Sequence, residues 1–197
     1  MRTFHVLMVL MLLPMVLSAG DVRVRPAQWA QPMLGTELDN FYQLDAEVYR
    51  SKQPDDEEMR MLASMGIRTI LNLREYHSDD DEAKNSGIAL IRIPVAAGEV
   101  NDEFVVRALR AIHRADKPIL IHCWHGSDRT GVVSAMYRMV FQNWPREQAI
   151  DEFINGGFGY HARFYPNIEQ YLKTVDVADI RRQVMVGDPL SSANHRR

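Results

Sequence analysis

The sequence predicts a single domain with an α/β fold, in which a short central sheet is flanked by helices. Short apolar segments of strand length alternate along the chain with longer segments that repeat apolar residues at helical spacing. The chain has 197 residues, which suffices for one hydrophobic core. With 46% hydrophobic and 25% charged residues, its composition is that of an ordinary globular protein.

The first twenty residues differ from the rest of the chain. Arg2 gives a positive start, Val6 to Leu17 is almost entirely apolar, and small residues follow at 18–20. This order predicts a secretory signal peptide over residues 1–20, and hence an exported protein, periplasmic or secreted, without stable membrane insertion after cleavage. An uncleaved anchor over 6–17 is the lesser alternative, because a membrane span needs roughly 20 apolar residues. The net charge of −3 gives no reason to expect nucleic acid as a partner.

Residues 21–40 show no clear periodicity and are expected to form an extended lead-in. The folded domain is expected over 41–180, followed by a loose C-terminal tail over 181–197. The domain begins with two short segments, 41–43 and 48–50, whose aromatic and β-branched residues around a turn predict two strands.

A helix is expected next, because 53–56 combines a proline with the acidic residues that favour a first helical turn. Gly66 can end this helix. The β-branched, alternating segment 67–73 predicts a strand. The acidic run 77–82, within the segment 74–87, is typical of a solvated loop.

Residues 89–93 predict another strand, which ends at a proline and leads into the loop 94–100. Asn101 is expected to cap a helix that has acidic residues in its first turn and an apolar inner face. The short apolar segment 118–121 predicts a buried strand.

The C-terminal half is expected to be mainly helical. Apolar periodicity predicts helices over 130–142 and 146–154, separated by a proline-containing break. The aromatic segment 158–165 is expected to form either a wall of the substrate pocket, with His161 or Arg163 at the substrate, or an anchor for the last helix. That last helix is expected over 166–175.

The loop that follows the strand 118–121 carries the chemistry. A strand–loop–helix junction directs backbone N–H groups and the positive end of a helix dipole toward an anion. The whole stretch over 122–131 reads His-Cys-Trp-His-Gly-Ser-Asp-Arg-Thr-Gly. The residues expected to surround a bound phosphate are Trp124, His125, Gly126, Ser127, Asp128 and Arg129.

Cys123 is the single cysteine of the chain, so it has no partner for an internal disulfide. The dipoles of the loop and Arg129 favour its thiolate, which can attack phosphorus. Arg129 can hold two phosphate oxygens and stabilise their charge in the transition state. Thr130 is expected to hydrogen-bond to Cys123 or to the phosphate, and His122 to orient the loop.

These ten residues resemble the active-site signature of the protein tyrosine and dual-specificity phosphatase superfamily. Residues 42–172 resemble its compact members: the atypical dual-specificity phosphatases of plants and fungi, and exported bacterial tyrosine phosphatases. The resemblance implies the cysteine-phosphatase fold, Cys123 as nucleophile and Arg129 as phosphate clamp. It implies no cofactor and no metal. The expected substrate is a phosphorylated protein, with small phosphorylated molecules or phosphoinositides as the alternative.

The proton donor to the leaving group has three candidates. The family usually takes it from an aspartate on a loop before the phosphate-loop strand, and no aspartate lies within 94–100. Asp102 follows that loop at a helix start, and Glu99 lies in the loop itself. Asp128 is the third candidate, because lipid phosphatases of the myotubularin type resemble its Gly-x-Asp-Arg-Thr context. Asp128 and Asp102 rank level, ahead of Glu99.

Four other assignments fit the sequence less well. Arsenate reduction normally needs further cysteines, and rhodanese-like loops do not usually end in Arg-Thr-Gly. A phosphate-binding module without catalysis is disfavoured, because both Cys123 and Arg129 are present. A metal site made of His122, Cys123 and His125 is disfavoured because these residues are too close in sequence to close a tetrahedral site.

Overall fold

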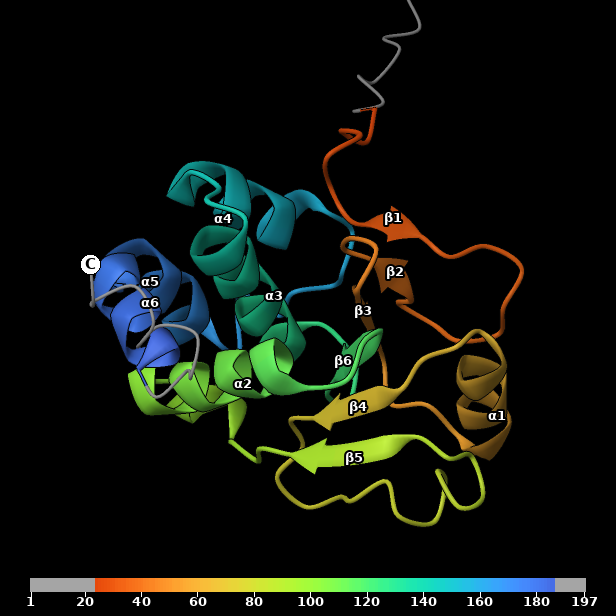
Figure 1. The fold of residues 1–197 in the computed structure, drawn as a ribbon. Helices are drawn as coiled ribbons and strands as arrows, with labels where there is room; N and C mark the ends of the chain where they lie inside the picture. Colours follow the sequence, from red (N-terminus) through yellow and green to blue (C-terminus); the bar gives the residue numbers. More distant parts are fainter. Residues whose placement is uncertain (1–23, 187–197) are drawn as a thin grey trace, which may run out of the picture.

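The fold is given by a computed structural model, which describes residues 24–186 (Figure 1). Its six strands are β1 (Gln31–Pro32), β2 (Tyr42–Gln43), β3 (Val48–Ser51), β4 (Thr69–Asn72), β5 (Ala89–Arg92) and β6 (Ile119–His122). Its α-helices are α1 (Asp56–Ser64), α2 (Asp102–Arg114), α3 (Asp128–Phe141), α4 (Arg146–Asn155), α5 (Pro166–Thr174) and α6 (Val177–Met185), and a 3-10 turn η1 spans Ala97–Glu99. A sheet flanked by helices confirms the predicted α/β fold. The predicted signal peptide lies outside the described residues.

The strands form one mixed sheet in the order β1-β2-β3-β6-β4-β5. The strands β3, β6, β4 and β5 run parallel to one another, and β1 and β2 add an antiparallel edge. In this register His122, the last residue of β6, pairs with Ser51 of β3 and with Asn72 of β4. The loops after these three strands therefore begin side by side at the carboxyl edge, where parallel sheets place their binding sites.

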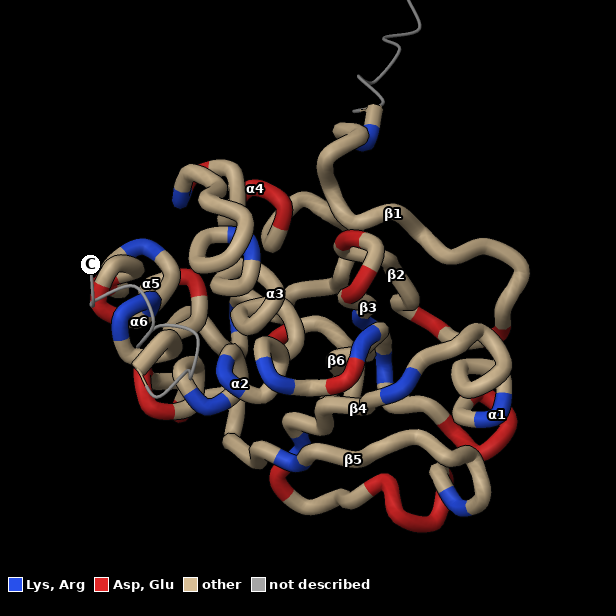
Figure 2. The backbone as a smooth tube through the Cα atoms, in the orientation of Figure 1, with Lys and Arg blue, Asp and Glu red and all other residues tan. Residues whose placement is uncertain are grey.

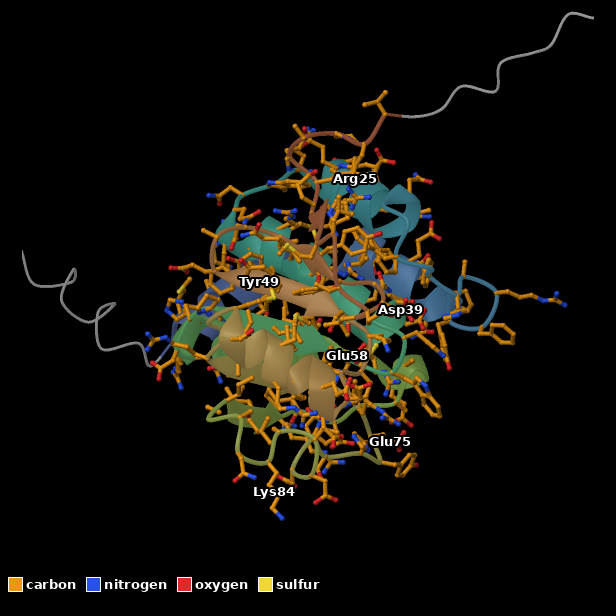
Figure 3. The ribbon with its side chains drawn as sticks, turned by 90° about the vertical axis from the view of Figure 1, so that its right-hand side faces the viewer. Arg25, Asp39, Tyr49, Glu58, Glu75 and Lys84 are labelled. Atoms are coloured by element: carbon orange, nitrogen blue, oxygen red, sulfur yellow. The ribbon has the colours of Figure 1, made fainter. Side chains whose placement is uncertain are left out.

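The two faces of the sheet are covered unequally (Figure 1). Helix α1 packs on one face, where Met59 and Leu62 join Ile70 and Leu120 in a small core. Figure 3 looks onto this face, with α1 lying across the sheet. The helices α2 to α6 supply the larger core on the other face. The site loop is thus backed by the thicker helical layer.

Local capping explains where several helices begin. Asp55 accepts from the backbone N–H of Glu58, and the Glu58 carboxylate accepts from that of Asp55, a reciprocal capping box at the start of α1. Gly66 follows α1 with a φ of +88°, a left-handed conformation that suits glycine. Asn101 caps α2 as predicted, accepting from the backbone N–H of Phe104.

The predicted boundaries at the two ends of the domain need correction. The lead-in contains β1 and the buried Trp29, and the Ala30 N–H donates to the Glu152 carboxylate, so this segment is anchored to the domain. Figure 3 labels Arg25 in this segment. The chain after 166 forms two helices rather than one, and α6 runs through the predicted start of the tail at 181. Its Ile180 and Val184 are buried.

Within the part of the chain that the structure describes, no helix is long and apolar enough to cross a membrane.

Candidate active site

The loop between β6 and α3 turns its carbonyl groups outward. The carbonyl of Trp124 accepts from the backbone N–H of Gln53, and that of His125 accepts from the Asn40 side chain at 2.8 Å. The carbonyl of Gly126 accepts from Nη2 of Arg50 at 2.5 Å. Since three consecutive carbonyls are held on the outside, the N–H groups of this loop are directed to its inside. This is the arrangement that binds an oxyanion.

Gly126 lies where only glycine fits. Its φ is +72°, and a Cβ built on it would lie 2.4 Å from the backbone carbonyl oxygen of Ser51. The loop therefore passes directly against the end of β3.

We expect Gly126→Ala to lower kcat for an aryl phosphate by about 10²-fold, because the carbonyl of Ser51 forces the loop to shift and the phosphate moves off the nucleophile. Steady-state kinetics, with circular dichroism to check folding, tests this. The control is Gly98→Ala, since no atom lies within 4 Å of a Cβ built on Gly98. Equal rates for the two variants would contradict the account.

Cys123 is 2% exposed at the start of the loop and is a free thiol. The preceding His122 is buried; its Nδ1 contacts the Cys123 carbonyl at 3.1 Å and its Nε2 contacts Oδ2 of Asp79 at 2.8 Å. Both partners offer acceptor oxygens, so the two contacts fix the orientation of the ring behind the loop. The predicted role of His122 as an orienting residue is supported by these contacts.

Asp79 corrects the prediction of a solvated acidic loop. Figure 2 shows the acidic residues gathered on the loop between β4 and β5, but Asp79 itself is 3% exposed. Its carboxylate accepts from Gln53, Asn72 and His122. Burial works to raise its pKa, but the hydrogen bond and charge of His122, together with the Gln53 hydrogen bond and the His77 charge, outweigh burial and leave the pKa lowered.

We expect Asp79→Ala to lower the free energy of unfolding at pH 7 by about 3 kcal/mol, because it leaves the buried donors of His122, Asn72 and Gln53 without their acceptor. Since folding lowers the pKa of Asp79, its stabilisation is present above the ordinary value of 3.8 and is lost as the pH falls below it. Urea unfolding at pH 7 and pH 3 should therefore show the difference between wild type and variant shrinking in acid. Asp80→Ala, at an exposed neighbour, is the control; an equal effect would contradict the account.

Arg50 is a buried cation behind the loop. It is 1% exposed, its guanidinium lies 3.7 Å from the centre of the Phe158 ring, and it binds the Gly126 carbonyl. Desolvation lowers its pKa to about 10, while the charges of Glu152 and Cys123 act to raise it. Arg50 is therefore a cation at neutral pH and favours the Cys123 thiolate.

Arg129 is oriented by the loop that precedes α2. Its Nη1 donates to the Val95 carbonyl at 3.1 Å, and its Nε is buried without a hydrogen-bond partner among the described residues. Arg74, two residues after β4, lies close enough that desolvation and the Arg129 charge lower its pKa. The Arg74 guanidinium lies 4.7 Å from the centre of the Trp124 ring. Arg74 thus adds a second positive charge beside the clamp.

A cavity of about 330 Å³ opens over the loop. It is lined by Ala97, Trp124, His125, Asp128, Arg129, His161, Phe164 and Tyr165. Three of these residues come from the aromatic segment 158–165. The segment therefore forms a wall of the pocket, which is one of its two predicted roles. The segment is also an anchor, because Phe158 is buried and Tyr160 donates to the Tyr165 carbonyl. Arg163 is exposed and does not line the cavity.

The three predicted proton donors lie in different places. Asp128 lines the cavity and is 5% exposed. Asp102 is exposed in a separate hollow, where its Oδ1 accepts from the Tyr171 hydroxyl at 2.9 Å. Glu99 is exposed and does not line the cavity, to which its loop contributes Ala97. The structure thus brings only Asp128, of these three, together with Arg129.

Ser127, predicted to bind the phosphate, and Thr130, predicted to support the loop, lie at the start of α3. Ser127 is buried, and its hydroxyl lies 3.5 Å from the His125 carbonyl. Thr130 is fully buried, and its hydroxyl has no hydrogen-bond partner among the described residues, so the predicted bond to Cys123 is not formed.

Sequence reasoning did not identify Asn40, Arg50, Arg74 and Asp79 as residues of the site. Asn40 lies in the lead-in, and its side chain also donates to the Phe158 carbonyl at 2.9 Å, joining the phosphate loop to the aromatic wall. The sheet register is the signal that would have found two of them: it pairs Arg50 with Ile121 and Asn72 with His122, which puts Arg50 and Arg74 next to the loop.

Comparison with known proteins places this site in context. A model of the tyrosine phosphatase family matches residues 36–178. The dual specificity protein phosphatase TpbA of Pseudomonas aeruginosa is 30% identical over 175 residues, which cover 87% of this chain and 78% of TpbA. The inositol diphosphatase SIW14 of Saccharomyces cerevisiae is 29% identical over 154 residues, which cover 73% of this chain and 53% of SIW14.

Solved structures of the same relatives share the fold of this chain. The crystal structure of P. aeruginosa TpbA superposes with a TM-score of 0.74 at 29% identity, covering 82% of this chain and 99% of that one. A TpbA variant in complex with phosphotyrosine matches with the same TM-score at 28% identity, covering 83% of this chain and 100% of that one. The core catalytic domain of SIW14 from S. cerevisiae, bound to citrate, matches with a TM-score of 0.64 at 27% identity, covering 80% and 94%.

Proposed function

The chain belongs to the tyrosine phosphatase family, and from that premise we propose that it hydrolyses phosphotyrosine in proteins, outside the cytoplasm. Cysteine-dependent phosphatase chemistry is the activity of its family. The proposal adds to this family activity a substrate, phosphotyrosine in proteins, and a location outside the cytoplasm.

The observation that carries the choice of substrate is the composition of the cavity. Trp124, Phe164 and Tyr165 line the cavity with aromatic rings, and two of them, Trp124 and Phe164, are 60% and 75% exposed. A planar phenyl ring can stack between such side chains. In the described part of the chain, Arg129 is the one Lys or Arg that lines this cavity, which suits a single phosphoryl group.

A second candidate substrate class is the inositol pyrophosphates, the substrates that the name of SIW14 indicates for that relative. Arg74 favours this class, because it adds positive charge beside Arg129 for a further phosphate. Such ligands carry many phosphates and need several cations around them. The cavity of this chain, with aromatic residues in its lining, fits phosphotyrosine better.

The test compares kcat/KM for a phosphotyrosyl peptide with that for an inositol pyrophosphate. We expect the peptide to be preferred by at least about 10²-fold, on the strength of ring stacking and charge. Arg74→Gln is the matched variant: it should have a small effect on the peptide and a large one on any inositol pyrophosphate activity. A preference for the inositol pyrophosphate would overturn the proposal.

Export is supported by the sequence of residues 1–20, with its positive start, apolar run and small residues. The lone cysteine also fits a protein that needs no disulfide partner outside the cytoplasm. Fractionation followed by N-terminal sequencing tests this. A chain that begins at Asp21 in the periplasm or medium supports export, and an uncleaved chain in the membrane fraction supports the anchor over 6–17 instead.

A further inference from the structure

The family's usual source of the leaving-group proton is missing from the cavity. The loop 94–100 contributes Ala97 to the lining, and Asp102 is held by Tyr171 in another hollow. The ionisable residues that line the cavity are His125, Asp128, Arg129, His161 and Tyr165. The donor must come from a group that can carry a proton at neutral pH and reach the substrate.

Asp128 has both carboxylate oxygens occupied. Oδ1 accepts from the backbone N–H of His161 at 2.9 Å, and Oδ2 lies 2.8 Å from Nδ1 of the same residue. Asp128 is also the first residue of α3, so its backbone is held by the helix. Because both of its oxygens contact His161, Asp128 fixes the position of the His161 side chain.

His161 is the partner that Asp128 fixes. Its Nδ1 donates to Asp128, which leaves Nε2 to carry the second proton of an imidazolium. The side chain is 36% exposed and lines the cavity that contains Arg129. Its ring centre lies 5.3 Å from that of His125 and 6.5 Å from that of Phe164, so the ring is part of the cavity wall.

We infer that His161 is the catalytic acid of this enzyme and that Asp128 is its positioning residue. The inference rests on the proposed hydrolysis of aryl phosphates and adds the source of the proton. The pair resembles the aspartate and histidine of a serine protease, in which the aspartate holds the histidine in one tautomer and stabilises its cationic form.

The reaction balances with these groups. The Cys123 thiolate attacks phosphorus, the S–P bond forms and the P–O bond to the leaving group breaks. The electron pair of that bond stays on the leaving oxygen, which takes the proton from Nε2 of His161. The neutral imidazole then takes a proton from water while the water oxygen attacks phosphorus and the S–P bond breaks. Inorganic phosphate leaves and the thiolate returns.

The test uses two substrates that differ in their need for a proton: phenyl phosphate, with a poor leaving group, and 2,4-dinitrophenyl phosphate, with a good one. His161→Gln should lower kcat/KM for phenyl phosphate by about 10²- to 10³-fold and for the dinitrophenyl ester by less than about 3-fold. Asp128→Asn should show the same pattern to a smaller extent. His125→Gln is the matched control, and it should change both rates by the same factor.

Retained turnover of the dinitrophenyl ester also shows that the variant is folded and that the cysteine chemistry is intact, so failure here is distinct from failure of the proposed function. Equal losses for both esters in His161→Gln would overturn the assignment. Unchanged phenyl phosphate activity in His161→Gln, with a steep loss in Asp128→Asn, would instead make Asp128 the acid and would also overturn it. In His161→Gly, added imidazole should restore phenyl phosphate activity.

Discussion

Cys123→Ser should lower kcat for every phosphate ester by at least about 10⁴-fold, because a serine hydroxyl at this position has neither the charge nor the nucleophilicity of the thiolate. The charge of Arg50 and the dipoles of the loop favour the negative charge of a thiolate, whereas a serine hydroxyl stays protonated and gains nothing from them. Steady-state kinetics with an aryl phosphate measures this loss.

The same variant should keep its fold and its affinity for phosphate esters. The substitution exchanges one small buried atom for another, and the carbonyl bonds to Gln53, Asn40 and Arg50 that shape the loop do not involve the thiol. Calorimetric titration with a phosphotyrosyl peptide should therefore give a Kd similar to that of the wild type. Wild-type turnover by Cys123→Ser would contradict the mechanism, and loss of binding would contradict the proposed loop geometry.

Arg129→Lys should lower kcat/KM for an aryl phosphate by about 10³-fold, because lysine keeps the charge but loses the planar fork that holds two phosphate oxygens. The bond from Nη1 to the Val95 carbonyl, which orients the fork, is also lost. Most of the loss should appear in kcat, since the equatorial oxygens gain charge as the transition state forms.

Arg107→Lys, on the exposed surface of α2, is the control and should be within about 2-fold of the wild type, as expected for a surface substitution. If Arg129→Lys behaves like this control, Arg129 is not the clamp, and the proposed phosphate geometry is wrong.

Most of the elements could be predicted because their signals are local. The cap at Asn101, the acidic first turn of α1 and the apolar strands are each contained within a few residues. Helix α6 was not predicted, because much of what holds it is distant in sequence: Arg181 donates to the carbonyls of Met139 and Val140.

In the active site, too, the residues of a local motif could be predicted and the residues that are distant in sequence could not. The nucleophile and the clamp lie six residues apart and could be predicted from one motif. The groups that shape the loop could not, because Arg50 is 76 residues from the carbonyl it binds and Asn40 is 85 residues from its own. Asp79 has the sequence context of a solvated loop, and only the contact of the loop with His122 shows that it is buried.

The central claim is that phosphate passes through Cys123. Rapid acid quenching of the enzyme during turnover of an aryl phosphate, followed by peptide mass spectrometry, tests it most directly. We predict a phosphoryl group on the peptide that contains Cys123, present during turnover and absent in Cys123→Ser. A phosphoryl group on another residue during turnover, with Cys123 unmodified, would contradict the account.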